Sequence, residues 1–106
     1  MLTADLGVGT VGRMSRPIHA DDVFRAVAHP ARRRILELLL EHGSMTPSEM
    51  LGPLRIGRTS LSHHLRMLRE ASLVSQKRRK RERVYEPRIA SVRKLVRWGD
   101  GLIKSK

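Results

Sequence analysis

Apolar residues recur at a helical spacing along much of the chain, most clearly over residues 31–42. They fall at i, i+4, i+7 and i+8, which places them on one helix face: they are Ala31, Ile35, Leu38 and Leu39. Pro30 suits the first turn of this helix, and Gly43 suits its C-terminal cap. A shorter helix begins at Asp21 and Asp22 and ends before Pro30, because the residue preceding a proline disfavours helical backbone.

Two more helices follow, and the first has a clear start signal. Residues 46–49 read Thr-Pro-Ser-Glu, in which the threonine can cap a helix, the proline suits its first position and the glutamate completes a capping box. We expect this helix over residues 47–53. After the short connection 55–57, a longer helix is expected over residues 58–71, with a buried face formed by Leu61, Leu65 and Leu68.

Strand-like patterns occur at residues 73–76 and 83–85, and a basic run, Lys77 to Arg81, lies between them. This arrangement predicts a two-stranded hairpin with a cationic tip. Pro87 is expected to open a final helix that runs to Lys104 along a partly apolar stripe.

The predicted fold is therefore mostly α with a small β-hairpin: four helices, the hairpin and a final helix. The third and fourth helices form a helix-turn-helix candidate, and the hairpin directly after them makes it winged. Residues 1–19 show no period and are expected to be a flexible arm, which leaves 20–106 as one domain. Gly7, Gly9 and Gly12 match the spacing of a dinucleotide-binding loop, but too few residues precede them for the required strand.

Charge changes this picture, because it is distributed unevenly. Of the +12 net charge, residues 1–57 hold 7 basic and 6 acidic side chains, whereas residues 58–106 hold 15 basic and 4 acidic ones. Such asymmetry points to a polyanionic partner. The absence of cysteine excludes disulfides and thiolate metal sites. No apolar run is long enough for a bilayer span and no secretory signal is visible, so the expected location is the cytoplasm, at the nucleoid.

Two segments resemble the ArsR/SmtB family of bacterial winged-helix repressors. Residues 28–39, Ala-His-Pro-Ala-Arg-Arg-Arg-Ile-Leu-Glu-Leu-Leu, are similar to that family's second helix. Residues 62–74, Ser-His-His-Leu-Arg-Met-Leu-Arg-Glu-Ala-Ser-Leu-Val, are similar to its recognition helix and first wing strand. The similarity extends from about residue 21 to residue 98. It implies a homodimeric DNA-binding repressor of a family in which many members release DNA when a metal binds.

The resemblance implies that helix 58–71 enters the major groove, that hairpin 77–83 reaches the DNA backbone or minor groove, and that the terminal helices form a dimer. Three positions depart from the family's glycines. Arg55 lies between the two helices, Ser72 follows the recognition helix, and Lys and Arg occupy the wing. We expect these changes to alter local geometry rather than the fold.

The residues themselves support DNA recognition, because cations displace counterions from phosphates while side chains on a helix reach base edges. The candidates for base reading lie early in the fourth helix: Arg58, Thr59, Ser60, Ser62 and His63. The candidates for backbone contact lie in that helix and the wing: Arg66, Lys77, Arg78, Arg79, Lys80, Arg81 and Arg83. Arg32, Arg33 and Arg34 are compatible with either phosphate contact or solubility.

Metal and catalytic chemistry find little support. His64 is expected to be a buried, hydrogen-bonded structural residue, and His19, His29 and His42 are isolated in sequence. Residues 47–54 lack the family's thiolate ligands, and the final helix lacks the histidine and paired acids of its other common site. No cofactor is expected. Ser60 and Ser62 lie near His63 without an acid to orient a base, so an enzyme is not expected.

The terminal helices are expected to form a homodimer interface rather than a membrane-surface element. Its candidates are Val23, Phe24, Val27, Ile89, Val92, Leu95, Val96 and Leu102. The sequence thus predicts a homodimeric, sequence-specific double-stranded-DNA-binding repressor that lacks the family's usual metal sites and reads an operator with an approximate inverted repeat. Two alternatives stay open: a structured-RNA or ribosome-associated basic protein, and a protein-interaction module that no longer reads DNA.

Overall fold

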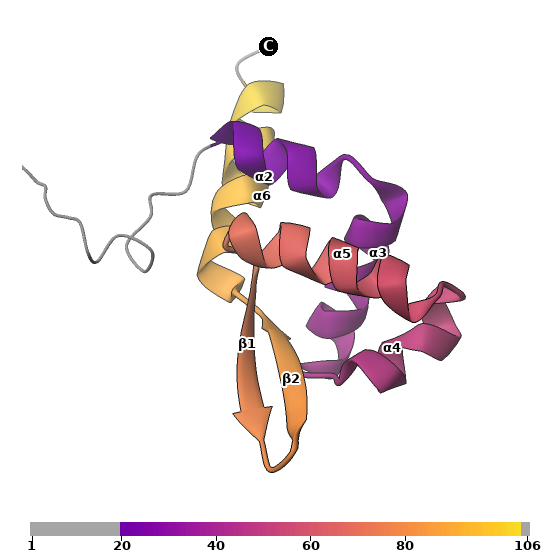
Figure 1. The fold of residues 1–106 in the computed structure, drawn as a ribbon. Coiled ribbons are helices and arrows are strands. Elements are labelled where there is room, and N and C mark those ends of the chain that lie inside the picture. The colour runs from indigo at the N-terminus through magenta and orange to yellow at the C-terminus, as the bar shows by residue number, and fades with distance from the viewer. Residues whose placement is uncertain (1–19, 105–106) are drawn as a thin grey trace, which may run out of the picture.

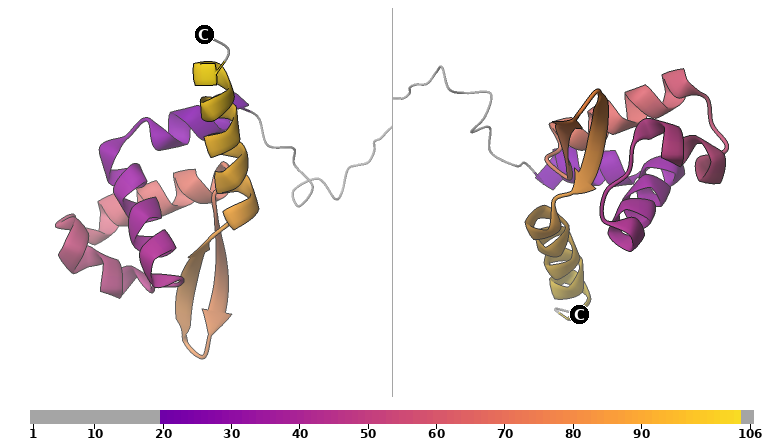
Figure 2. Two further views of the ribbon diagram at one scale, coloured as in Figure 1. Left: turned by 180° about the vertical axis from the view of Figure 1, so that it is seen from behind. Right: turned by 90° about the horizontal axis from the view of Figure 1, so that it is seen from below.

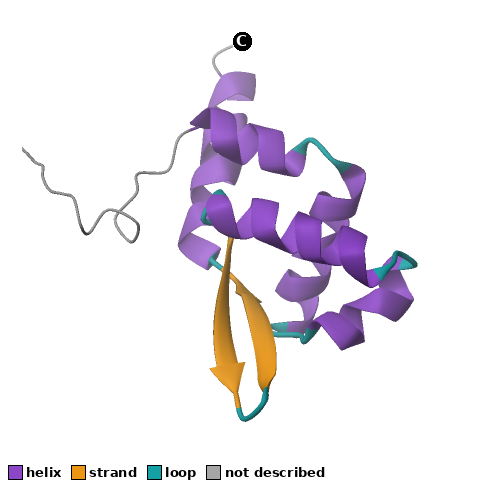
Figure 3. Cartoon of the chain, viewed as in Figure 1, coloured by secondary structure: helices purple, strands orange, loops and turns teal. Residues whose placement is uncertain are grey.

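The computed structural model describes residues 20–104 (Figure 1). The predicted arm over residues 1–19 lies outside the described residues. The elements follow the predicted order: α2 (Ala20–Val27), α3 (Pro30–His42), α4 (Pro47–Leu54), α5 (Arg58–Glu70), β1 (Val74–Arg79), β2 (Glu82–Pro87) and α6 (Ile89–Lys104). The fold is mostly helical with a β-hairpin wing, as the sequence predicts. Short loops join the helices, and the hairpin extends from the helical body (Figure 3).

A single apolar core joins the helices to the base of the hairpin. Its largest fully buried side chains come from α3, α4, α5, the connection that precedes β1 and the hairpin: Ile35, Leu39, Met50, Leu61, Leu68, Leu73, Val74 and Val84. α3 packs against α2, α4, α5 and β2. The predicted apolar stripes of α3 and α5 are therefore the faces that meet in the core.

Local side-chain and backbone bonds fix where the helices begin and end. Thr46 and Glu49 form the predicted capping box: Thr46 Oγ1 accepts from the Glu49 backbone N–H at 3.2 Å, and Glu49 Oε1 accepts from the Thr46 N–H at 2.8 Å. Gly43, with φ +90°, closes α3 by donating to the Leu39 carbonyl at 2.7 Å. His29 caps the N-terminus of α3, because its Nδ1 accepts from the Ala31 N–H at 3.0 Å.

The hairpin is longer than the sequence predicts. Lys77, Arg78 and Arg79 belong to β1 rather than to a loop, and only Lys80 and Arg81 lie between the paired ends Arg79 and Glu82. Pro87 pairs with Val74 at the end of β2, so the expectation that it opens the final helix is wrong. Both differences arise from cross-strand pairing. The pattern of apolar and polar residues within one strand does not show how many of its residues pair with the other strand.

Among residues 20–104, three non-glycine residues adopt left-handed backbone. Two of them are the single positions at which the resemblance implies glycine, and the third lies within the basic run of the wing. Arg55 has φ 58°, Ser72 has φ 63° and Lys80 has φ 59°. The Cβ atom of a non-glycine residue makes this conformation unfavourable by roughly 1–2 kcal/mol relative to the right-handed one, because it lies too close to the following carbonyl oxygen. The connections at these positions therefore retain a backbone that glycine adopts freely, now occupied by residues that bear some strain.

α6 lies beside α2 and projects from the side of the molecule (Figure 2). The two helices meet through Phe24 and Trp98, whose ring centroids lie 4.2 Å apart with an interplanar angle of 52°. Within residues 20–104, none of the helices is long and apolar enough to cross a membrane.

Candidate nucleic-acid interface

The N-terminal half of α5 presents polar side chains to solvent. All five predicted base-reading residues are exposed: Arg58, Thr59, Ser60, Ser62 and His63. The spacing of positions 58, 59, 62, 63 and 66 places them along one side of a helix, whereas Ser60 departs from that side. Arg58 Nη2 lies 3.4 Å from Ser48 Oγ, so α4 supports the first side chain of this row. Leu61 and Leu65 hold the opposite face in the core.

The hairpin contributes a second cationic surface. Its exposed cations without an ion-pair partner among residues 20–104 are Arg78, Arg79, Lys80, Arg81 and Arg83. Arg78 and Arg83 lie directly opposite each other in the strand register, and like charges in that position repel. A polyanion placed between them relieves this repulsion. Lys77 differs, because its Nζ lies 3.0 Å from Glu86 Oε2 and its charge is already balanced.

The three arginines at the start of α3 have partners within the chain. Arg32 is 9% exposed, and its Nε donates to the Ala26 carbonyl at 2.8 Å. Arg33 Nη1 donates to the Val27 carbonyl at 2.8 Å. Both guanidinium groups satisfy carbonyls at the C-terminus of α2, where positive charge is favourable. Sequence reasoning weighed phosphate contact against solubility, and this structural role explains Arg32 better than either. Arg34 lies 3.4 Å from Glu37 in an exposed ion pair.

His64 is buried, as predicted, but the expected hydrogen bond is not found at its Nδ1. The residue is 8% exposed, and Nδ1 has no hydrogen-bond partner among the described residues. Its ring lies 4.5 Å from that of His29, which is isolated only in sequence, and 5.5 Å from that of His63. Burial lowers the pKa of His64, and the nearby charges of His29, Arg32 and His63 lower it further. Among residues 20–104, no cluster of three or more potential metal-binding side chains is present.

The predicted dimer residues divide into buried and exposed groups. Val23 belongs to the core, and Val27, Val92 and Leu95 pack partly against it. Val96 is 63% exposed and Ile89 is 44% exposed. The side chain of Leu102 lies outside the described part of the chain.

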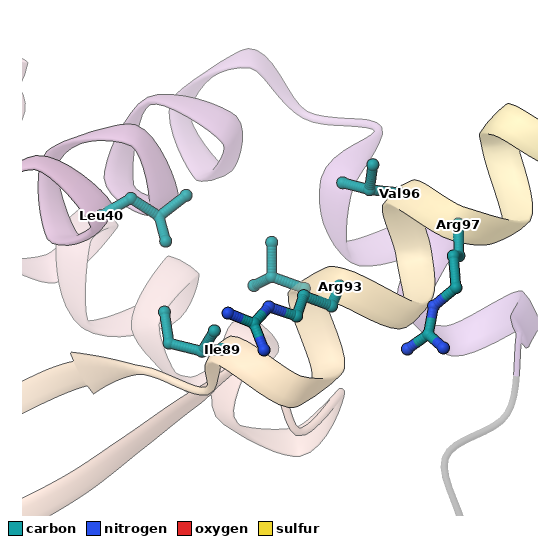
Figure 4. A pocket seen from close by; sticks show the side chains of 6 residues that line it. Leu40, Ile89, Arg93, Val96 and Arg97 are labelled. Carbon is teal, nitrogen blue, oxygen red and sulfur yellow. The ribbon is translucent and has the colours of Figure 1, made fainter.

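The exposed residues of α6 line an open groove of about 420 Å³ (Figure 4). Its lining is apolar apart from two arginines and consists of Leu40, Ile89, Val92, Arg93, Val96 and Arg97. Sequence reasoning missed Leu40, since its position at the end of α3 lies next to α6 only in the folded chain. Leu40 is 47% exposed and lies at the edge of the buried face of α3, next to the exposed Glu37 and Glu41.

Comparison with known proteins identifies the family to which this chain belongs. A family model described as a helix-turn-helix domain matches residues 27–76. The transcriptional repressor SdpR of Bacillus subtilis is 32% identical over 78 residues, which cover 74% of this chain and 86% of SdpR. The chain belongs to the ArsR family of helix-turn-helix transcriptional regulators. It is a DNA-binding regulator of this family, which is not a family of enzymes.

Solved structures agree with the ArsR assignment. The ArsR-like transcriptional regulator from Rhodococcus sp. RHA1 is 25% identical, with a TM-score of 0.69 over 80% of this chain and 79% of that one. The transcriptional repressor BigR from Xylella fastidiosa is 27% identical, with a TM-score of 0.63 over 73% of this chain and 78% of that one. The winged arrangement of α4, α5 and the hairpin is thus shared with solved ArsR-like regulators.

Proposed function

We propose that this ArsR-family protein is a homodimeric repressor that binds an operator with approximate two-fold symmetry. Two copies of α5 enter successive major grooves roughly 34 Å apart, and each wing lies along the neighbouring phosphate backbone. The observation that carries the proposal is the opposed pair Arg78 and Arg83, which lack an anionic partner among the described residues. SdpR and BigR, which this chain resembles, both bear the name of repressors.

The two DNA-binding surfaces have different tasks in this proposal. Arg58 and His63, exposed near the start of α5, read base edges, while Thr59 and Ser62 contact bases or phosphates. Ser60 departs from this side of the helix and is the weakest of the base-reading candidates. Arg66 and the wing cations contact phosphates, which sets position and affinity rather than sequence. The ion pair between Lys77 and Glu86 leaves Lys77 as the weakest of the backbone candidates.

Selection of bound sequences from random duplexes tests this division. Replacing Arg58 with Ala is expected to relax preference at particular base pairs, because a guanidinium distinguishes guanine from other bases. Replacing Arg81 with Ala is expected to weaken binding to every duplex by a similar factor. Enrichment of no sequence at all, or preference for structured RNA over duplex DNA in a direct competition, contradicts the proposal.

The dimer in this proposal uses the exposed apolar side of α6. Burying Val96 and Ile89 against a second copy removes apolar surface that a single chain leaves in water. V96E places a charge in that interface, whereas A90E places the same charge on an exposed residue that does not line the groove. Sedimentation equilibrium is expected to show a monomer for V96E and a dimer for A90E. A dimeric V96E protein contradicts this interface.

We also propose that zinc does not regulate DNA binding by this protein. The chain contains no cysteine, and α4 accordingly offers none of the thiolate ligands that its family often has there. Addition of zinc or a chelator is therefore expected to leave DNA affinity unchanged, as measured by fluorescence anisotropy. A tenfold change on chelation contradicts this part of the proposal.

A further inference from the structure

We propose that Gln76 is a positioning residue that fixes the angle of the wing relative to the recognition helix. Its side chain joins α5 to both strands of the hairpin, so that the wing cations lie at a set distance from the base-reading residues. The inference concerns how the two proposed DNA-binding surfaces are held together, and its consequence for DNA binding rests on the proposed function.

Gln76 Oε1 accepts two hydrogen bonds from different elements. Arg69 Nη1 donates to it from the last turn of α5, and Tyr85 Oη donates to it at 3.1 Å from β2. Gln76 and Tyr85 are direct partners in the strand register. One carbonyl oxygen with two lone pairs can accept both bonds, so a single atom links the helix to each strand.

The Tyr85 side of this link continues into the rest of the domain. Tyr85 is 6% exposed, and its backbone exchanges two hydrogen bonds with Met45, at 2.8 and 3.0 Å. Met45 lies between α3 and α4 and is itself buried. The wing base is thereby fixed on one side to the helical core and on the other, through Gln76, to α5.

The covalent connection between α5 and β1 makes such a link useful. Only residues 71–73 separate the two elements, and Ser72 has φ 63°. Backbone hydrogen bonds hold this connection against α5, since the Ser72 N–H donates to the Arg69 carbonyl and the Leu73 N–H donates to the Leu68 carbonyl, each at 3.0 Å. These bonds fix the start of the hairpin but do not reach the strand residues beyond it. The bond from Arg69 to Gln76 opposes rotation of the hairpin about that connection.

The link also gives Arg69 a different role from that of Arg66. Its guanidinium is engaged with a neutral amide, whereas Arg66, one turn earlier on α5, is exposed with no hydrogen bond or ion pair to the described residues. Arg69 thus acts on the wing, and Arg66 is available to phosphate. Because Gln76 is uncharged, its replacement by a neutral residue alters the link without altering the charge of the wing.

A spin-label distance measurement without DNA tests the link itself. The chain has no cysteine, so R66C and K80C introduce the only labelling sites, one on α5 and one at the wing tip. Labelled protein diluted with unlabelled protein avoids distances between subunits. Q76M, which removes the acceptor at similar size, is expected to broaden or shift the distance distribution. Q76E, which keeps the acceptor, and S75A on the opposite strand face are expected to match the parent.

Two results overturn the proposal: a Q76M distance distribution identical to that of the parent, or an S75A distribution that is broadened as much as that of Q76M. This readout is independent of DNA binding, so its failure is separate from failure of the proposed function. Circular dichroism at the same temperature verifies that each variant is folded, and an unfolded Q76M is replaced by Y85F, which removes one of the two donors.

A salt titration on a 30-base-pair duplex of arbitrary sequence then measures the consequence. R81A is expected to make the plot of log affinity against log salt shallower by about 0.9 for each phosphate that is no longer neutralised. Q76M is expected to do the same without loss of charge, and R81A added to Q76M is expected to have less than half of its effect in the parent. Equal effects of R81A in both backgrounds overturn the positioning role, whereas no effect of R81A in the parent contradicts the role of the wing in the proposed function.

Discussion

The arginines at the start of α3 and those of the wing differ in what they contact. Arg32 and Arg33 donate to the Ala26 and Val27 carbonyls, and Arg34 faces Glu37. In the wing, Arg78 faces Arg83, and neither has an ion-pair partner among residues 20–104. Arginine therefore stabilises the domain at the start of α3. In the wing it has no such partner and, in our proposal, binds an external anion.

This difference shows that the number of cations does not by itself locate a nucleic-acid surface. Residues 32–34 form a basic cluster in the sequence much as residues 77–81 do, yet in the second cluster only Lys77 has an ion-pair partner among residues 20–104. A guanidinium already bonded to its own backbone gives up hydrogen bonds if it turns to a phosphate, whereas a like-charged pair gains from the same approach. The position of the partner, which only the fold reveals, separates the two roles.

The largest effect on folding is expected at Arg32. R32A leaves the Ala26 carbonyl without its charged donor and removes a buried side chain, which is expected to lower the free energy of unfolding by about 2 kcal/mol. R34A is the matched control, because its exposed ion pair contributes less than about 1 kcal/mol. Urea denaturation monitored by circular dichroism measures both. Equal urea denaturation midpoints for the two variants contradict the claim that Arg32 stabilises the domain more than the exposed Arg34 does.

A smaller effect is expected where left-handed backbone carries a side chain. S72G and K80G each relieve a positive φ and are expected to raise the free energy of unfolding by about 1 kcal/mol. The two differ in function: K80G also removes a wing cation and is expected to weaken DNA binding, whereas S72G is not. Thermal unfolding and duplex binding together provide the two readouts. A destabilised S72G contradicts the assignment of strain at this position.

The smallest effect is a pH dependence centred on His64 of α5, whose ring lies 4.5 Å from that of His29 and whose pKa is lowered by burial and also by the charge of Arg32. Its pKa is lowered from 6.5 in the folded chain, so the unfolded chain binds the proton more readily. The contribution of neutral His64 to the free energy of unfolding is therefore fully present above pH 6.5, and it is lost as the pH falls through the lowered pKa.

H64L is expected to flatten the dependence of the melting temperature on pH between about 5.5 and 7.5. It also removes a buried Nδ1 that lacks a partner, so it is not expected to lower stability at the upper end of that range. H42Q, at an exposed histidine, is the control and should retain the slope of the parent. A parental slope in H64L contradicts the role of this imidazole.

Local signals in the sequence predict the helices well, because capping residues and apolar periods act over a few positions. The capping box at Thr46 and the cap at Gly43 are examples. Contacts between distant segments are not encoded in this way. Neither the bond from Arg32 to Ala26 nor the approach of His29 to His64 has a local signature. The extent of the hairpin was missed for a related reason, since strand pairing depends on the partner strand.

The exposed side of α5, which we propose contacts DNA, could be predicted from the sequence. A helical period identifies which side of α5 faces the core, so the exposed positions follow from the buried ones. The groove beside Leu40 and the link at Gln76 required the fold, because each joins side chains from separate elements.

The central claim is that the position of a cation, and not the total charge, determines its contribution to DNA binding. Two variants of equal charge test it: R33Q with R34Q in α3, and R78Q with R81Q in the wing. The measurement is the salt dependence of affinity for one duplex. We predict a parental slope for the α3 variant and, for the wing variant, a slope shallower by about 0.9 for each phosphate left without its cation. An equal reduction of the slope in both variants contradicts the account.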